Sequence, residues 1–329
     1  MSSTKSIAAP LLRWFGQARN RRDLPWRTAK RDPYATWISE VMLQQTRVDV
    51  VVPYFERFLK RFPTLRALAE APLDDVLAHW SGLGYYSRAR NLHAAAQAAS
   101  PALPKTRDAL AELPGFGPYT AAAVASLAHN EDVALVDGNV ARVFARLFKL
   151  PGDARKASWE LAPQLLPKGR AAQFNEALME LGATVCTPRK PDCPACPLRA
   201  LCDGRENPEA YPAPKERKPR PELAWDALAL RRKDGAVLLA RRPEGLFKGL
   251  WDLPHKGPLP GVRAGALQLH GLVEQTLTHR EVRVTIHGGP ATGTPKSTEL
   301  RWVQPADLHT LGLSSLARKS LRKAGVPLP

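Results

Sequence analysis

Apolar residues recur at helical spacing through most of the first 205 residues. The stretch TWISEVMLQQTRVDVVV (36–52) places its apolar residues on one stripe, which predicts a helix that Pro53 interrupts. The segments LDDVLAHW, SRARNLHAAAQAAS and ARVFARLFKL repeat this spacing further along the chain. We therefore expect an almost wholly helical first part, and we find no convincing internal repeat.

The spacing changes after residue 222, where strand-like patterns replace helical ones. AWDALALRR and AVLLARR flank Asp234-Gly235, a turn pair typical of a β-hairpin. EVRVTIH (281–287) alternates apolar and polar residues as a half-buried strand does. LRWVQPADLHTL adds a strand and a short helix, and SSLARKSLRKAG predicts a terminal helix that Gly325 ends. The second part is therefore expected to be α+β.

A proline-rich and charged stretch separates these two patterns. ENPEAYPAPKERKPRPELAW (206–225) contains five prolines and has no periodicity, which is typical of an exposed linker. A chain of 329 residues is also long enough for two domains. We expect a helical domain at 1–205, a linker at 206–222 and an α+β domain at 223–329.

The charge of the chain is strongly positive. Lys and Arg number 48 against 31 Asp and Glu, a formal net charge of +17. This balance favours a polyanionic partner such as nucleic acid, although solubility alone is an alternative explanation. No apolar run reaches the length of a membrane span, and the N-terminus lacks the apolar core of a secretory signal. We expect a cytoplasmic protein with no membrane partner.

All four cysteines of the chain lie in CTPRKPDCPACPLRALC, with the spacing C-x6-C-x2-C-x5-C. Cys186, Cys193, Cys196 and Cys202 can surround one centre, and either zinc or an iron–sulfur cluster suits four thiolates. A reducing compartment disfavours the disulfide alternative. The spacing therefore predicts a metal-binding loop.

A second motif, LPGFGPYTAAAVAS (113–126), predicts a tight turn between two helices, the first beginning near Thr106. Pro118 is placed to open the second helix. We expect Gly115 and Gly117 to adopt backbone conformations that a Cβ would block. The turn and the following helix N-terminus would offer N–H groups to an anion, whereas the ordinary alternative is a plain helical hairpin.

Two carboxylates stand beside apolar helical stripes. Asp137 precedes the stripe of LVDGNVARVFARL, where an N-cap is the ordinary interpretation. Glu40 lies within WISEVMLQQT, where an exposed helical glutamate is the ordinary interpretation. The pattern alone leaves both roles open.

The cysteine spacing and the turn motif resemble those of the endonuclease III superfamily of DNA glycosylases. Within it, DLPWR, SEVMLQQT and GLGYYSRARNLH closely resemble the MutY family of adenine DNA glycosylases, over roughly residues 11–205. The resemblance implies a helix-hairpin-helix domain, a [4Fe–4S] cluster on the four cysteines, and a phosphate grip at the hairpin. It also implies a monomer acting on duplex DNA with adenine:8-oxoguanine or adenine:guanine mispairs, associated with the nucleoid if the source is bacterial.

The same resemblance implies roles for individual residues. Glu40 would be the general acid and Asp137 would stabilise the sugar cation or bond to it, with support from Tyr119 and Asn139. The implied adenine pocket comprises Trp26, Arg27, Leu43, Val48 and Glu176. The implied DNA contacts in this part are Gly115, Gly117, Gln45, Tyr85 and Arg88, of which Gln45 and Tyr85 would wedge into the duplex. For the wedge and for Trp26, Arg27 and Glu176, a purely structural role is an equal alternative.

The second part resembles the Nudix-like domain of the same family less closely. It lacks a glutamate-rich Nudix box, and HKGPLPGVRAGALQLHG fills that region, so we expect a binding module. Leu277, Thr278 and His279 stand where the family has Phe-Ser-His, which implies that Thr278 and His279 sense the lesion. Two rival functions remain: a bifunctional glycosylase/lyase, which Tyr119 disfavours because it offers no amine, and a non-catalytic iron–sulfur DNA-binding module.

Overall fold

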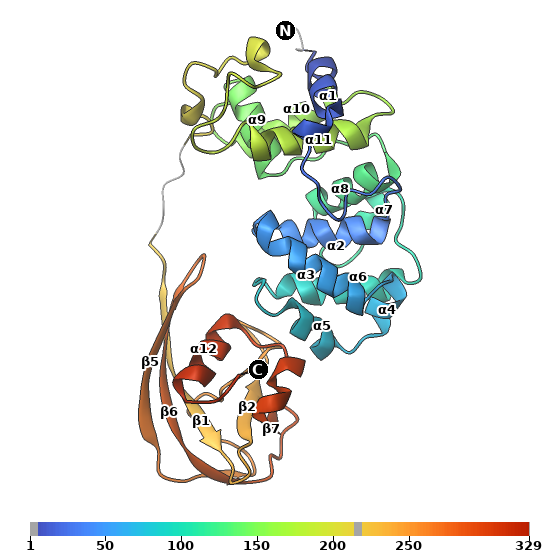
Figure 1. Cartoon of the computed structure of the whole chain (residues 1–329). Coiled ribbons are helices and arrows are strands. Elements are labelled where there is room, and N and C mark those ends of the chain that lie inside the picture. The colour runs from blue at the N-terminus through green and yellow to red at the C-terminus, as the bar shows by residue number, and fades with distance from the viewer. Residues whose placement is uncertain (1–5, 214–218, 329) are drawn as a thin grey trace. The chain divides into compact units, whose positions relative to one another are not determined.

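The computed structural model describes residues 6–213 and 219–328 of the chain, which form two compact units (Figure 1). The first unit comprises Met1–Arg66 and Ala95–Glu216, and the second comprises Ala67–Ala94 and Arg217–Pro329. A helical segment from the first part of the chain thus belongs to the second unit. Residues 214–218 of the predicted linker lie outside the described residues.

Helices make up most of the chain before the linker, as the sequence predicts. They are α1 (Ala8–Gly16), η1 (Ala18–Asn20), α2 (Pro33–Leu43), α3 (Val48–Arg61), α4 (Leu65–Glu70), α5 (Leu73–Trp80), α6 (Ser87–Ala99), α7 (Arg107–Ala111), α8 (Pro118–His129), α9 (Gly138–Leu147), α10 (Ala154–Leu165), α11 (Ala171–Thr184) and η2 (Arg199–Leu201). One short 3₁₀ helix, η3 (Pro208–Ala210), lies within the predicted linker.

The prediction of one helix through 36–52, ended by Pro53, is wrong. The break lies between α2 and α3, where Gln45 adopts a left-handed backbone with φ of 58°. Pro53 lies inside α3, where it removes a single backbone donor and the helix continues to Arg61. The apolar stripe thus spans two helices with a turn between them.

The core of the first unit forms where α1, α8, α9, α10 and α11 meet. Leu11, Leu135, Phe144 and Leu178 are all at most 1% exposed within this cluster. The helix α2 packs beside α8, where the rings of Trp37 and Phe116 stack with their centroids 5.2 Å apart. This packing fixes α2 and α8 relative to one another.

The second unit is built around a mixed sheet. Its strands are β1 (Glu222–Arg231), β2 (Val237–Arg241), β3 (Trp251–Asp252), β4 (Val262–Ala264), β5 (Gln268–Thr276), β6 (Glu281–Gly293) and β7 (Leu300–Val303). The pair β1–β6 is parallel and the other pairs are antiparallel, in the order β3-β2-β1-β6-β4, with β5 on β6 and β7 on β2. Figure 1 shows the long strands β5 and β6 side by side.

The elements predicted for the second part are confirmed. The β1–β2 hairpin turns at Gly235, whose φ is +86°. The strand predicted at 281–287 is part of β6, and the short helix after β7 is the 3₁₀ helix η4 (Pro305–Thr310). The terminal helix α12 (Ser315–Lys323) packs against β5 and β6 and is followed by Gly325 at φ +71°. Among the described residues, no helix is both long and apolar enough to cross a membrane.

Candidate active site

The predicted helical hairpin is present at α7 and α8. Thr106 caps α7 through its Oγ1, and the chain then turns at Gly115, whose φ is +77°. The second helix opens with Pro118 at its first turn. Gly115 therefore occupies a conformation that favours glycine, as predicted.

The conformational prediction for Gly117 is wrong. Its φ is −72°, which any residue can adopt, and a Cβ added there would meet nothing within 4 Å. What distinguishes Gly117 is the open space beside the N-terminus of α8. A small residue there leaves the backbone N–H groups of the turn accessible to an approaching anion.

The hairpin borders a cavity of about 1150 Å³ in the first unit. The cavity is lined by residues from α2, α3, α8, α9, α10 and α11 and from the loop before α2. Twelve of the predicted site residues line it, although they are spread over 150 positions of the sequence. They are Trp26, Arg27, Glu40, Leu43, Gln45, Val48, Gly115, Gly117, Tyr119, Asp137, Asn139 and Glu176.

Glu40 is buried at the wall of this cavity, so its ordinary interpretation as an exposed glutamate is wrong. It is 6% exposed, and its Oε2 accepts a 2.5 Å hydrogen bond from the Tyr119 hydroxyl. Burial raises the pKa of Glu40 to about 7, against the opposing effect of the Tyr119 hydrogen bond. Asp137 and Glu176 raise it further and Arg27 lowers it. A carboxylic acid with this pKa can hold a proton near neutrality and give it away.

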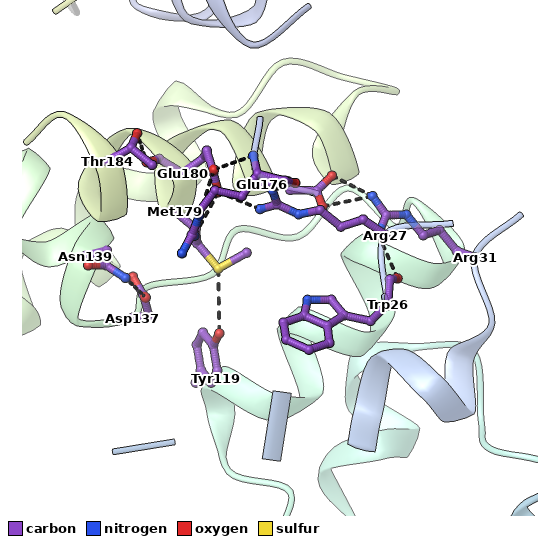
Figure 2. Close-up of polar contacts among 11 residues, drawn as sticks. Trp26, Arg27, Arg31, Tyr119, Asp137, Asn139, Glu176, Met179, Glu180 and Thr184 are labelled. Carbon is purple, nitrogen blue, oxygen red and sulfur yellow. Dashed lines mark hydrogen bonds and ion pairs between the residues drawn. The ribbon is translucent and has the colours of Figure 1, made fainter. Parts of the chain in front are cut away.

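Asp137 both caps a helix and faces the cavity. Its Oδ1 accepts from the Val140 N–H at 2.7 Å, so the N-cap interpretation is correct. Its Oδ2 accepts from Asn139 Nδ2 at 2.9 Å, a pair visible in Figure 2. Burial raises the pKa of Asp137, while the bonds from Val140 and Asn139 oppose that rise. The cap therefore fixes the carboxylate in the cavity wall and stabilises its ionised form.

Two carboxyl groups in one cavity thus have different environments. Glu40 is buried and accepts from one hydroxyl, whereas Asp137 accepts from the Val140 N–H and the Asn139 side-chain amide. Such a pair can divide the work, with one group acting as an acid and the other stabilising positive charge. Burial and the nearby Glu40 raise the pKa of Tyr119 well above its usual value, so this hydroxyl remains a donor.

A network of two buried glutamates and three partly exposed arginines closes one side of the cavity. We name Arg22, Arg27, Arg31, Glu176 and Glu180 the arginine–glutamate cluster. Glu176 pairs with Arg27 Nε at 2.9 Å and with Arg31 Nη2 at 2.7 Å, contacts that Figure 2 shows. Glu180 binds Arg22 and Arg27.

Several residues at the cavity were not predicted from the sequence. Arg22, Arg31 and Met179 line it, and Met179 Sδ lies 3.7 Å from the Tyr119 hydroxyl (Figure 2). The sequence contained one signal for the arginine–glutamate cluster. Glu180 follows Glu176 by four positions and therefore lies on the same face of the helix.

The four cysteines line one small cavity of about 30 Å³, and all are partly buried with no disulfide between them. Burial raises the pKa of Cys196 to about 11, so binding a cation there would displace protons. As placed, no group of three or more His, Cys, Asp or Glu in the described residues has the geometry to hold a single metal ion. The donor set of four sulfurs around one hollow nonetheless fits a cluster with one thiolate per iron.

Two arginines of α9 hold the cysteine loop. Arg146 is 2% exposed, and its Nη1 lies 3.3 Å from Cys186 Sγ and 2.7 Å from the Thr187 carbonyl. Arg142 donates from Nε to the Cys186 carbonyl at 2.8 Å and from Nη2 to Asn139 Oδ1 at 2.7 Å. The loop is thereby connected to the amide that orients Asp137.

The remaining predicted DNA contacts lie in the second unit. Thr278 and His279 are exposed at the tip of the β5–β6 hairpin, which the Leu277 N–H closes onto the Arg280 carbonyl at 2.8 Å. The Thr278 hydroxyl forms a hydrogen bond with the Tyr85 hydroxyl.

Arg88 Nη2 donates to the carbonyls of Leu83 and Gly84 at 3.3 Å, and burial lowers its pKa to about 10. This side chain therefore supports the turn that carries Tyr85.

The two predicted wedge residues share an unusual backbone. Gln45 has φ of 58° and Tyr85 has φ of 48°, both in the left-handed region that disfavours side chains. Strained positions of this kind gather at functional sites, where the surrounding structure holds them in place. The wedge role of both residues stays a prediction, because Asn130, Lys149 and Phe247 share this backbone region.

Comparisons with known proteins agree with this geometry. Residues 38–168 match the family model of the HhH-GPD superfamily of base excision DNA repair proteins, and residues 226–323 match that of the NUDIX domain. Adenine DNA glycosylase of Homo sapiens is 34% identical, over 98% of this chain and 74% of the human protein. The Mus musculus enzyme is also 34% identical, over 98% of this chain and 78% of its own length.

A solved structure of a thermostable thymine-DNA glycosylase is 33% identical, with a TM-score of 0.55 over 60% of this chain and 94% of that one. The expected helix-hairpin-helix and Nudix-like folds are confirmed by the family models. The sequence identity to the adenine DNA glycosylases extends over almost the whole chain, so it shows the family as well as the fold. The chain belongs to the adenine DNA glycosylases.

Proposed function

We propose that this protein is a monofunctional base-excision-repair glycosylase that hydrolyses the N-glycosidic bond of adenine in duplex DNA. The observation that carries the proposal is the cavity that Glu40, Tyr119 and Asp137 share with Arg27 and Glu176. An adenine inside a duplex cannot reach such a cavity, so it must first rotate out of the stack.

The reaction follows from the two carboxyl environments. Glu40 transfers its proton to a ring nitrogen of adenine, and the C1′–N9 bond breaks with its electron pair going to the base. The sugar becomes an oxocarbenium-like cation, which the Asp137 carboxylate stabilises or bonds to. Water then supplies hydroxide to C1′, and its remaining proton returns the carboxyl pair to its starting state. Asn139 keeps Asp137 aimed at the sugar through the 2.9 Å bond.

A lyase activity is disfavoured by the same cavity. A Schiff base requires an amine, and Tyr119 provides a hydroxyl in the hairpin position. Among the described residues that line the cavity, arginine is the only type with a basic side chain, and none is a lysine. Borohydride should therefore trap little covalent complex with substrate DNA.

We further propose that the preferred substrate is adenine opposite 8-oxoguanine, with guanine as the weaker partner. Support comes from the exposed Thr278 and His279 at the hairpin tip. An oxidised guanine gains a donor at N7 and an oxygen at C8, which a hydroxyl and an imidazole can recognise. We assign catalysis to 1–205 and lesion recognition to 223–329, joined by 206–222, in a monomer that works on chromosomal DNA in the cytoplasm.

The four cysteines are proposed to hold a [4Fe–4S] cluster. Their shared cavity and the arginines that fix the loop support this assignment. When bound, the iron–sulfur cluster would hold the cysteine loop in one conformation beside α9. None of the excision steps above involves the iron–sulfur cluster.

The test is single-turnover release of free adenine from duplexes that differ only in the base opposite adenine. We expect the order 8-oxoguanine, then guanine, then thymine. Protein 1–222 should retain excision but lose at least about tenfold in its preference for 8-oxoguanine over guanine. Failure to release adenine from any duplex would overturn the proposed reaction, and an unchanged preference in 1–222 would overturn the recognition role alone.

A further inference from the structure

Glu180 is a buried acid that the excision mechanism does not use. It is 0% exposed and lies on α11, one helical turn after Glu176. Glu176, Met179 and Ala183 of the same helix line the cavity, whereas Glu180 stands behind that wall. A charged group buried this deeply requires a structural or functional explanation.

The carboxylate of Glu180 is fully engaged by two arginines. Its Oε1 accepts from the Arg22 backbone N–H and from Arg22 Nε, both at 2.9 Å. Its Oε2 accepts from Arg22 Nη2 at 2.9 Å and from Arg27 Nη2 at 2.8 Å. Although burial alone raises the pKa of Glu180, these hydrogen bonds outweigh it and hold the pKa below its usual value. Glu180 is therefore ionised.

These contacts pin both ends of a short loop. Arg22 and Arg27 bracket the loop, and Arg27 also closes it by donating from Nη1 to the Arg22 carbonyl at 3.2 Å. Between them, Leu24 and Trp26 are 8% and 7% exposed and line the cavity. The loop is thus a wall of the cavity whose position depends on Glu180.

The net charge of the arginine–glutamate cluster also depends on Glu180. Glu176 and Glu180 lie four residues apart on one face, where like charges repel, and Arg27 bonds to both. Three arginines against two glutamates leave one positive charge. Neutralising Glu180 would leave two.

We propose that Glu180 is the positioning residue of the adenine pocket: it fixes Arg22 and Arg27 so that their loop forms the pocket wall, and it balances the arginine charge beside Glu40. This inference rests on the proposed function and deepens it. Glu180 touches neither the base nor the sugar and acts through Arg27.

The charge balance has a consequence for Glu40. The groups that influence Glu40 are Tyr119 on α8, Asp137 before α9, Glu176 on α11 and Arg27 in the loop. An additional uncompensated positive charge among them favours ionised Glu40 and so lowers its pKa. Since catalysis needs protonated Glu40, the loss of activity with rising pH should begin at lower pH.

The experiment is a single-turnover pH profile of the full-length protein on an adenine:8-oxoguanine duplex. The reaction amplitude reports the folded fraction, and the rate constant reports the folded enzyme alone. For Glu180→Gln we expect a rate constant at least about tenfold lower near neutrality. We also expect the basic limb of its profile to move down by about half to one pH unit. The matched control Glu160→Gln makes the same chemical change at an exposed site on α10 and should leave the limb in place.

A charge-restoring variant separates this role from a merely structural one. Glu180→Gln combined with Arg22→Gln returns the cluster to one net positive charge, and we expect its basic limb to return to the wild-type position. A wild-type limb in Glu180→Gln, or a displaced limb that the double variant does not restore, would overturn the inference. If wild-type protein released no adenine, the proposed function would fail instead, so the two failures are distinguishable.

Discussion

Adenine excision should fall as pH rises through about 7, because the general acid is lost. Burial is the largest influence on Glu40 and raises its pKa to about 7. With that value, about nine-tenths of Glu40 is protonated near pH 6 and about one-tenth near pH 8. The single-turnover rate constant should therefore drop about ninefold between these conditions, and substrate binding at fixed salt should change little over the same range.

The Tyr119 hydroxyl allows a check on the direction in which its hydrogen bond changes the pKa of Glu40. Its hydrogen bond stabilises ionised Glu40 and lowers the pKa of that group. Tyr119→Phe removes the donor, so the basic limb should move to higher pH even though the maximal rate falls. The assay is quenched-flow or manual single-turnover release of adenine from about pH 5 to pH 9.

Two results would refute this reasoning. A rate constant that stays constant or rises from about pH 6 to pH 9 would show that protonated Glu40 does not supply the proton. A limb that moves to lower pH in Tyr119→Phe would show that the hydroxyl does not stabilise the carboxylate. Asp137 must be ionised, and burial raises its pKa too, so activity should also decline on the acid side.

Three further outcomes follow from the geometry. The pKa of Glu40 is raised from 4.5 to about 7 in the folded state, so the wild-type protein loses folding stability as pH rises through that range. Glu40→Gln should therefore be more stable to urea than the wild type by about 1–3 kcal/mol near pH 8. This gain should vanish below about pH 4.5. Gly182→Ala places a Cβ 2.6 Å from Asn139 Cβ and should cost about 1–3 kcal/mol in urea unfolding, whereas Gly117→Ala, which meets open space, should cost little. Arg146→Met should reduce iron per chain, measured by metal analysis, to less than about half of the expected four, and an unchanged iron content would show that the 3.3 Å contact with Cys186 does not secure the cluster.

Local signals in the sequence were sufficient wherever neighbours along the chain decide the structure. The hairpin turn at Gly235 and the turn at Gly115 both follow from residues whose own backbone preferences select the conformation. The N-cap at Asp137 is another local effect. Each of these could be predicted because the deciding atoms lie within four residues.

Features that depend on packing between distant segments were not predictable in the same way. The break between α2 and α3 occurs at Gln45, whose φ of 58° no local preference selects, while Pro53 is accommodated inside α3. The burial of Glu40 requires α8 to lie against α2, which brings Tyr119 within 2.5 Å from 79 positions away. A helical stripe alone cannot show what covers it.

The same limit explains the residues that were missed. The role of Glu180 depends on its contact with Arg22, which lies 158 positions away in the sequence. Family resemblance pointed to Glu176 and Arg27, which face the cavity, but not to the acid behind them. Support for a site is harder to infer from sequence than the site itself, because only the fold shows which charges are buried together.

The central claim is that two carboxyl groups in one cavity divide the excision of adenine between them. The most direct test is single-turnover adenine release by Glu40→Gln and by Asp137→Asn, compared with wild-type protein on the same adenine:8-oxoguanine duplex, with binding measured in parallel. Both variants should bind the duplex with nearly wild-type affinity and release adenine at least about a hundredfold more slowly. A rate within a few fold of wild type in either variant would contradict the account.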